Sequence, residues 1–171
     1  MKKIIPITLI LIILLCGCAK TPTIDDGFEF SLTFGIEGTS SYNSKTGELI
    51  RTKHSQNPEK YTATMTLPQD KLNEIANIIN ELNINSYPDK YDPVNDPKSL
   101  EIMTSSPSRT IILTVTTPEF TKTVNCSDID LFGGGYNAKS KAFLSAIDKI
   151  TEIITETDEW KAFPELDFGF C

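Results

Sequence analysis

The residues from Gly133 to Ser140 come nearest in this chain to a motif with known chemistry. They read Gly-Gly-Gly-Tyr-Asn-Ala-Lys-Ser and stand between a predicted strand and a predicted helix. The phosphate-binding pattern GxxxxGK, followed by Ser or Thr, needs its second glycine so that the backbone can curl around phosphate oxygens. Ala138 occupies that position, so we predict no nucleotide site. We interpret the glycines as a turn into a helix capped by Asn137, with an anion at the helix N-terminus as the alternative.

Oxygen-bearing side chains gather between residues 84 and 108, in a segment that contains four prolines. Four of these side chains could supply ligands to Ca²⁺: Asp89, Asp92, Asn95 and Asp96. Their spacing does not match an EF-hand loop, which alternates its ligands and needs a glycine at its sharp turn. Asp and Asn beside prolines also commonly start turns. We therefore predict turns and no metal site here, with Asp89, Asp92 and Asp96 as the only candidate ligands.

Acid–base or nucleophilic catalysis would have to involve His54, because it is the one histidine of the chain. Its neighbours Lys53 and Ser55 and its weakly patterned surroundings are typical of an exposed polar side chain. A zinc site would need three or four ligands at motif spacing, and His54, Cys126 and Cys171 do not form one. We predict no catalytic residue and no cofactor. A small hydrolase stays as a less favoured alternative, since two carboxylates that meet only on folding leave no sequence trace.

The N-terminal segment has the pattern of a secretory signal. Lys2 and Lys3 precede the twelve apolar residues Ile4–Leu15. This run is interrupted by Pro6 and is shorter than the about 20 residues that a spanning helix needs. The small residue Gly17 follows, at the place where a signal peptidase would cut. We therefore predict that residues 1–17 are removed.

The stretch Leu15-Cys16-Gly17-Cys18 resembles the lipobox of bacterial lipoproteins. The resemblance implies that the thiol of Cys18 carries the lipid and that this residue becomes the new N-terminus. It also implies that the chain is anchored in the cell membrane on its extracytoplasmic face. Two alternatives are acylation of Cys16, which the bulky Leu14 and Leu15 disfavour, and an ordinary signal that releases a soluble protein. Residues 18–27 then form the lipidated N-terminus and a polar tether.

Charge excludes one class of partner. The chain carries 16 basic and 23 acidic residues, a formal charge of −7. The signal contains two lysines and no acidic residue, so the mature chain keeps 14 basic and 23 acidic side chains, a charge of −9. Nucleic acid and anionic lipid surfaces both need a basic footprint. We therefore predict no nucleic-acid partner, and an envelope protein or ligand of unknown identity instead.

Two cysteines stay available in the mature chain, Cys126 and Cys171. Outside the cytoplasm they could form a disulfide that restrains the C-terminal tail. We favour the alternative, a half-buried Cys126 on a strand and an unpaired terminal thiol, because no second pair indicates a disulfide framework.

Period-2 alternation predicts strands in five places. The clearest covers residues 28–36, where Phe28, Phe30, Leu32, Phe34 and Ile36 alternate with polar or small residues. Weaker strands are expected over 48–54 and 61–67, and a hairpin over 110–117 and 120–126. The Gly-, Ser- and Asn-rich segment 38–47 is predicted to be a loop.

Period-3.6 patterns predict two helices. The first follows a capping-box spacing at Thr66–Gln69, contains the apolar stripe at positions 72, 75, 76, 79 and 82, and ends at Asn83. The second covers about 138–157. The aromatic tail Trp160–Cys171 is expected to pack back over the domain. Residues 28–171 should therefore form one α+β domain of order β-β-β-α-β-β-α, with an antiparallel sheet of about five strands and both helices on one face.

The assembled features resemble a group of uncharacterised bacterial lipoproteins. The resemblance rests on the lipobox, the Phe-rich first strand, the helix exit Asn83–Pro88 and the segment Trp160–Glu165. It implies fold and location only. We expect a membrane-anchored envelope protein with a non-catalytic binding or scaffolding domain. The alternative is an enzyme inhibitor that presents the 84–108 connection, which is long enough to be functional.

Overall fold

One antiparallel sheet forms the centre of the molecule. The computed structural model describes residues 27–93, 107–129 and 137–166. Within them the sheet has six strands in the order β4-β3-β2-β1-β5-β6. The bounds are Glu29–Phe34 for β1, Ser40–Asn43 for β2, Glu48–Ile50 for β3, Thr62–Thr64 for β4, Arg109–Thr116 for β5 and Thr121–Ile129 for β6.

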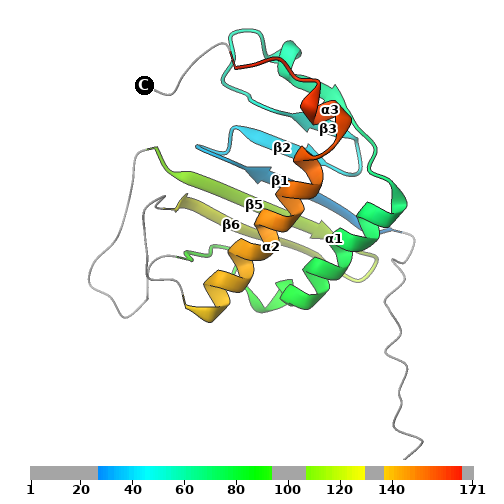
Figure 1. Cartoon of the computed structure of the whole chain (residues 1–171). Coiled ribbons are helices and arrows are strands. Elements are labelled where there is room, and N and C mark those ends of the chain that lie inside the picture. The colour runs from blue at the N-terminus through cyan, green and yellow to red at the C-terminus, as the bar shows by residue number, and fades with distance from the viewer. Residues whose placement is uncertain (1–26, 94–106, 130–136, 167–171) are drawn as a thin grey trace, which may run out of the picture.

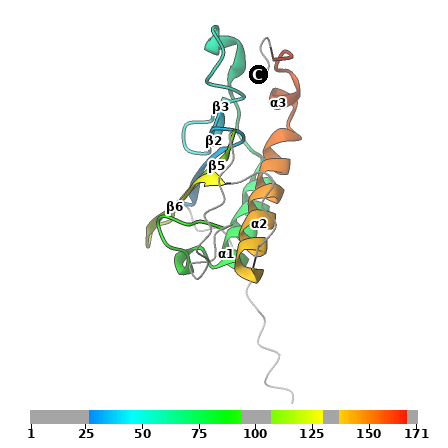
Figure 2. The ribbon, with the colours of Figure 1, turned by 90° about the vertical axis from the view of Figure 1, so that its left-hand side faces the viewer.

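The helices cover one face of this sheet, as Figures 1 and 2 show. They are α1 (Gln69–Leu82), α2 (Ala138–Thr155) and the short α3 (Asp158–Lys161). The predicted α+β class, the antiparallel sheet and the helical layer are therefore confirmed. Over the described ranges, no helix is both long and apolar enough to cross a membrane.

The predicted loop 38–47 is wrong, because it contains β2. This strand is short, and Tyr42 is its single large apolar residue, so alternation is hardly visible in the sequence. Tyr42 lies opposite Leu32 of β1 and Leu49 of β3, and all three side chains are buried. Pairing with two neighbours, rather than local pattern, makes this segment a strand and raises the strand number to six.

Two predicted strands are shorter than expected. The strand predicted over 48–54 ends at Ile50, and the one predicted over 61–67 is reduced to Thr62–Thr64 after a 3-10 helix, Pro58–Tyr61. The predicted capping box is also wrong, since Pro68 is the N-cap of α1 and no side chain caps it. The predicted cap of α2 is confirmed, because Asn137 Oδ1 accepts from the Ser140 N–H at 2.9 Å.

The core lies between the sheet and the helices. The inward residues of β1 and β5 are Phe30, Leu32, Phe34, Ile111, Leu113 and Val115, all at most 5 % exposed. They meet the predicted stripes of α1 and α2, which include Ile75, Ile79, Phe143, Ile147, Ile150 and Ile154. Each such side chain contributes roughly 1.5–3 kcal/mol of transfer free energy, which explains why β1 takes the middle of the sheet.

The start of the aromatic tail packs back over the domain, as predicted. The Trp160 ring lies 5.7 Å from Phe34, and the Arg51 guanidinium donates to the carbonyls of Phe163 and Pro164 at 3.1 and 2.9 Å. The Tyr61 hydroxyl donates to the Glu165 carbonyl at 2.9 Å. Residues 167–171, including Cys171, lie outside the described part.

Candidate functional site

The first part of the predicted 84–108 connection is packed against the sheet edge. Ile84–Ser86 forms a 3-10 helix, and Lys90 then makes a parallel bridge with Asn125 of β6. The Asn125 N–H donates to the Asp89 carbonyl at 2.8 Å, and the Tyr91 N–H donates to the Asn125 carbonyl at 2.9 Å. Over its described residues the predicted connection contains no long helix or strand, but it is held against the domain by this bridge. Asp89 and Tyr91 pair with the backbone of Asn125, on the edge strand β6.

Two tyrosines fix this segment to the start of α2. The rings of Tyr87 and Tyr91 lie 5.2 and 5.3 Å from the Phe143 ring. The Tyr87 hydroxyl donates to the Lys139 carbonyl at 3.1 Å, and the Tyr91 hydroxyl is hydrogen-bonded to Ser140 Oγ at 3.0 Å. Lys139 also places its ammonium 4.4 Å from the centre of the Tyr87 ring, a cation–π contact. The segment is thus held by these side chains as well as by its two backbone hydrogen bonds to Asn125.

A polar cleft of about 420 Å³ opens beside this edge, lined by Lys90, Tyr91, Asp92, Asn125 and Ser127. We call it the edge cleft. Bridge partners share a face of the sheet, so Lys90 and Asn125 both lie on the side away from the helices. The size is within the roughly 300–1,000 Å³ of small-molecule sites. Its groups are an ammonium, a carboxylate, an amide and a hydroxyl, which suit hydrogen bonding to a small polar ligand.

Of the candidate calcium ligands, the structure describes two, Asp89 and Asp92. Asp89 precedes Lys90 and therefore lies on the opposite face of the sheet, the face that the helices cover. Its carboxylate accepts from Lys122 Nζ at 2.6 Å. Asp92 lines the edge cleft, whereas Asn95 and Asp96 lie outside the described residues. In the parts of the chain that the structure describes, no three His, Cys, Asp or Glu side chains are arranged to hold a metal ion.

Cys126 is more deeply buried than the predicted half-buried strand position. It is 0 % exposed on β6, and burial, with a smaller effect of the Asp92 carboxylate, raises the pKa of its thiol to about 12. A thiol that stays protonated is a poor nucleophile and a poor metal ligand. The disulfide with Cys171 stays an untested prediction, because that residue lies outside the described part.

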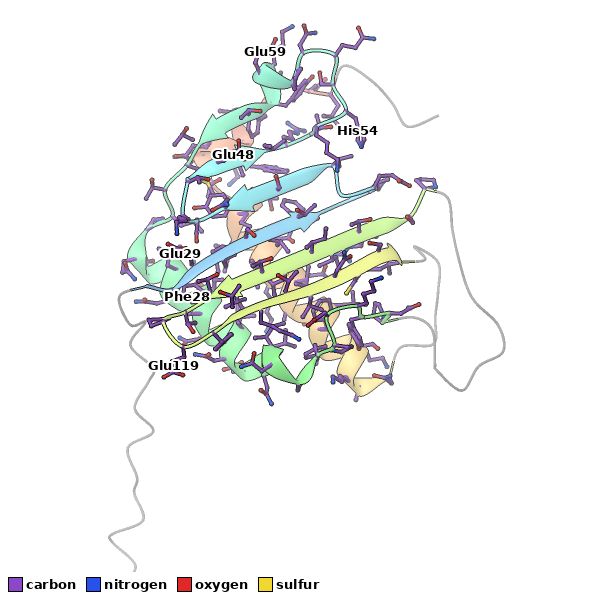
Figure 3. All side chains as sticks on the ribbon, turned by 180° about the vertical axis from the view of Figure 1, so that it is seen from behind. Phe28, Glu29, Glu48, His54, Glu59 and Glu119 are labelled. Carbon is purple, nitrogen blue, oxygen red and sulfur yellow. The ribbon has the colours of Figure 1, made fainter. Side chains whose placement is uncertain are left out.

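The other residues singled out in the sequence lie apart from the edge cleft. His54 is exposed in a bend at the opposite end of the sheet from Phe28 and Glu119 (Figure 3). Asn137 and Ala138 begin α2 as an ordinary capped helix. Gly133–Tyr136 and Cys18, the predicted lipidation residue, lie outside the described residues, as does the predicted signal.

The face of the sheet opposite the helices is open to solvent, and Figure 3 shows it from that side. Its outward positions are mostly hydroxyl-bearing, as in Ser31 and Thr33 of β1 and Thr114 and Thr116 of β5. Thr114 and Thr123 are hydrogen-bonded across β5 and β6 at 3.0 Å. High β propensity favours threonine on any solvated face, so this composition by itself indicates no ligand.

Sequence reasoning missed Lys90, Asn125 and Ser127 as site residues. The signal that could have found them is the pair Tyr87 and Tyr91, two large aromatic residues in a segment that is otherwise polar. Such rings are rarely left in water, so they indicate that the segment is packed against the domain.

Comparison of the chain with protein families, with curated proteins and with solved structures gives no match. The resemblance to uncharacterised bacterial lipoproteins therefore stays a prediction from the residues named above.

Proposed function

We propose that this chain is a lipid-anchored protein on the extracytoplasmic face of the cell membrane, whose domain binds a small polar ligand in the edge cleft without catalysis. The observation that carries the binding role is the edge cleft itself, built on a segment that two tyrosines fix to α2. The anchor rests on the signal-like segment and on Cys18.

The chemistry of the edge cleft favours binding over catalysis. A nucleophile needs a base within hydrogen-bond reach. The Ser127 hydroxyl instead donates to the amide oxygen of Asn125 at 2.8 Å, and an amide oxygen is not a base. The most nucleophilic group nearby, the Cys126 thiol, is buried on the helix side of β6.

The ligand we propose presents oxygen acceptors. The Lys90 ammonium and the Asn125 amide are donors on the same face of the sheet, next to the Ser127 hydroxyl. Carboxylates, carbonyls and sugar hydroxyls all fit such a donor set. The edge cleft is too small for a folded partner, so we infer a small molecule or the end of a polymer.

The alternative in which the 84–108 connection inhibits an enzyme has less support. The side chains of Tyr87 and Tyr91 are committed to α2, so these two rings are not presented to a partner. Replacing Tyr87–Tyr91 with a flexible linker would open the edge of β6 rather than remove a binding loop.

Chemical-shift titration of the mature, acylated protein in detergent micelles tests the binding role. The probes are single amino acids, N-acetylated sugars and small dicarboxylates. We expect at least one class to shift the amides of Lys90–Asp92 and Asn125–Ser127 selectively. Asn125→Ala should weaken that binding about tenfold, since one charge-assisted or neutral hydrogen bond is worth about 1–2 kcal/mol.

The matched control is Asn80→Ala, which removes an exposed amide on α1, in the helical layer. It should leave the affinity unchanged. Shifts spread over the helices, or equal affinity in Asn125→Ala, would contradict a site in the edge cleft. The anchor has its own test, because an unmodified thiol at Cys18 in mass spectra of the N-terminal peptide would exclude it.

A further inference from the structure

The described chain begins at one end of the sheet, beside two hairpin turns. Gly27 packs against Pro118, so closely that a Cβ on Gly27 would lie 3.2 Å from the Pro118 ring. The β5–β6 turn (117–120) and the β2–β3 turn (44–47) lie at this end because β1 and β6 start here and β2 and β5 end here. Phe28, Glu29 and Glu119 mark the same end in Figure 3. We call it the Gly27 end.

Hydrogen bonds fix the shape of both turns. Thr117 Oγ1 accepts from the N–H groups of Glu119 and Phe120 at 3.3 and 3.2 Å. Asn43 Oδ1 accepts from the N–H groups of Lys45 and Thr46 at 2.9 and 3.3 Å. The Gly27 end is therefore a preformed surface, and little conformational entropy is lost when something binds to it.

Apolar groups are partly exposed at this surface. Phe28 and Phe120 are half-buried and pack with one side against the core, whereas Pro118 is exposed. Among the described residues, the charges at this end include the Glu29–Lys45 ion pair, at 3.0 Å, and Glu119. Half-buried phenyl rings beside a proline favour insertion at the boundary of headgroups and acyl chains. The gain in free energy is about 25 cal/mol for each Å² of apolar surface that leaves water. A nearly neutral or slightly acidic rim suits zwitterionic rather than anionic headgroups.

The length of the tether indicates that the membrane is the surface in contact with the Gly27 end. Nine residues, Ala19–Gly27, separate Cys18 from β1. They span at most roughly 30 Å when extended. Such a short tether gives the Gly27 end an effective concentration at the bilayer in the millimolar range, so a weak contact is sufficient. We propose that Phe28, Pro118 and Phe120 rest on the membrane surface that holds the lipid of Cys18.

This orientation follows from the proposed lipid anchor and adds a consequence for the site. Residues Asn125 and Ser127 are farther along β6 from the Gly27 end than Thr121, where the strand begins. The edge cleft then lies farther from the headgroups than the turns do, so we expect its ligand to reach it from the solvent side.

Tryptophan quenching in vesicles tests the contact. The acylated full-length mature protein is reconstituted in phosphatidylcholine vesicles with brominated acyl chains, in a Trp160→Phe background. Phe120→Trp and Pro118→Trp should each lose more than half of their fluorescence relative to unbrominated vesicles. The matched control His54→Trp, at the opposite end of the sheet, should keep its fluorescence and be quenched by acrylamide instead.

Vesicle flotation separates the two proposals. Protein that does not float would overturn the lipid anchor and, with it, the contact. Protein that floats but shows equal quenching at residues 54 and 120, or none at 120, would overturn the contact and leave the anchor intact. Phe120→Trp keeps an aromatic ring at its half-buried position, so the test does not depend on whether Pro118→Trp preserves the turn.

Discussion

Cys126 makes stability depend on pH although it takes part in no proposed chemistry. Burial raises the pKa of its thiol from about 9 to about 12. Below pH 9 the thiol is protonated in both the folded and the unfolded state, so the stabilisation is complete. Above pH 9 the unfolded chain releases the proton and the folded chain does not, so stability falls by about 1.4 kcal/mol per pH unit. Burial raises the pKa of Tyr42, Tyr87 and Tyr91 as well, which adds to the loss above pH 10.

Cys126→Ala should therefore make the free energy of unfolding less dependent on pH under alkaline conditions. The free energy of unfolding between about pH 9 and pH 10 should decline less steeply than in the wild type, because the variant has no thiol whose pKa differs between the folded and the unfolded chain. Urea denaturation followed by Trp160 fluorescence at a series of pH values measures the slope. Equal slopes in the two proteins would mean that the thiol is not protected from ionisation.

Thr151 on α2 carries a buried hydroxyl without a hydrogen-bond partner among the described residues. Thr151→Val keeps the shape of the side chain and removes the unsatisfied group, so we expect stability to rise by about 1 kcal/mol. The matched control is Thr155→Val on the same helix, whose hydroxyl donates to the Glu152 carbonyl at 3.3 Å. It should be neutral or slightly destabilising in the same urea titration, and a gain of equal size there would contradict the explanation.

At the scale of elements, the segment at the β6 edge depends on tertiary contacts. Its backbone bonds to Asn125 are few, and its attachment to α2 comes from the rings of Tyr87 and Tyr91. The sequence of this segment contains Pro88 and three charged residues, Asp89, Lys90 and Asp92, so no local pattern predicts a strand. A partner on each side, β6 and α2, is what fixes it.

Hydrogen exchange of the Asn125 amide tests this dependence. In the wild type this amide donates to Asp89, and its exchange should be slow. Tyr91→Ala removes the ring that packs on Phe143 and should speed that exchange by tenfold or more, since at least about 1.4 kcal/mol of packing is lost. Tyr91→Phe keeps the ring and loses the bond to Ser140, so the effect should be much smaller. Unchanged exchange in Tyr91→Ala would show that the backbone bonds alone hold the segment.

The helices were predictable for a physical reason that does not apply to the short strands. An amphipathic helix repeats its stripe over several turns, so α1 and α2 were identified by their own residues. A strand of three or four residues, such as β2 or β3, has too few positions for alternation to be distinguished from chance. Its identity follows from its neighbours in the sheet.

At the scale of the whole molecule, the start of the tail covers the end of the sheet that carries β3 and β4. Arg51 and Tyr61 hold three consecutive carbonyls, those of Phe163, Pro164 and Glu165. The contact joins residues about a hundred positions apart in the sequence. It also places the Trp160 ring against Phe34, which is thereby shielded from water. The sequence indicated that the aromatic tail must be covered, but not where.

Tyr61→Phe should loosen this contact without disturbing the core. The Glu165 carbonyl loses its donor, and we expect a loss of about 1 kcal/mol in stability together with a red shift of Trp160 emission. Arg51→Met should shift the emission further, because two carbonyls lose their donor. The control Lys60→Met changes an exposed neighbour and should leave both signals unchanged. An unshifted spectrum in both variants would mean that the aromatic rings alone hold the tail.

The sequence by itself was enough to predict the α+β class, both long helices and the first strand, which the structure confirms, and the lipid anchor, which stays a prediction. These depend on periodicity, on capping residues and on a signal that acts before folding, all of which are local. Only the tertiary structure decided the sixth strand, the closed β6 edge and the edge cleft. Lys90, Asn125 and Ser127 come from two segments that are more than 30 residues apart, and no local pattern records which segments a folded chain brings together.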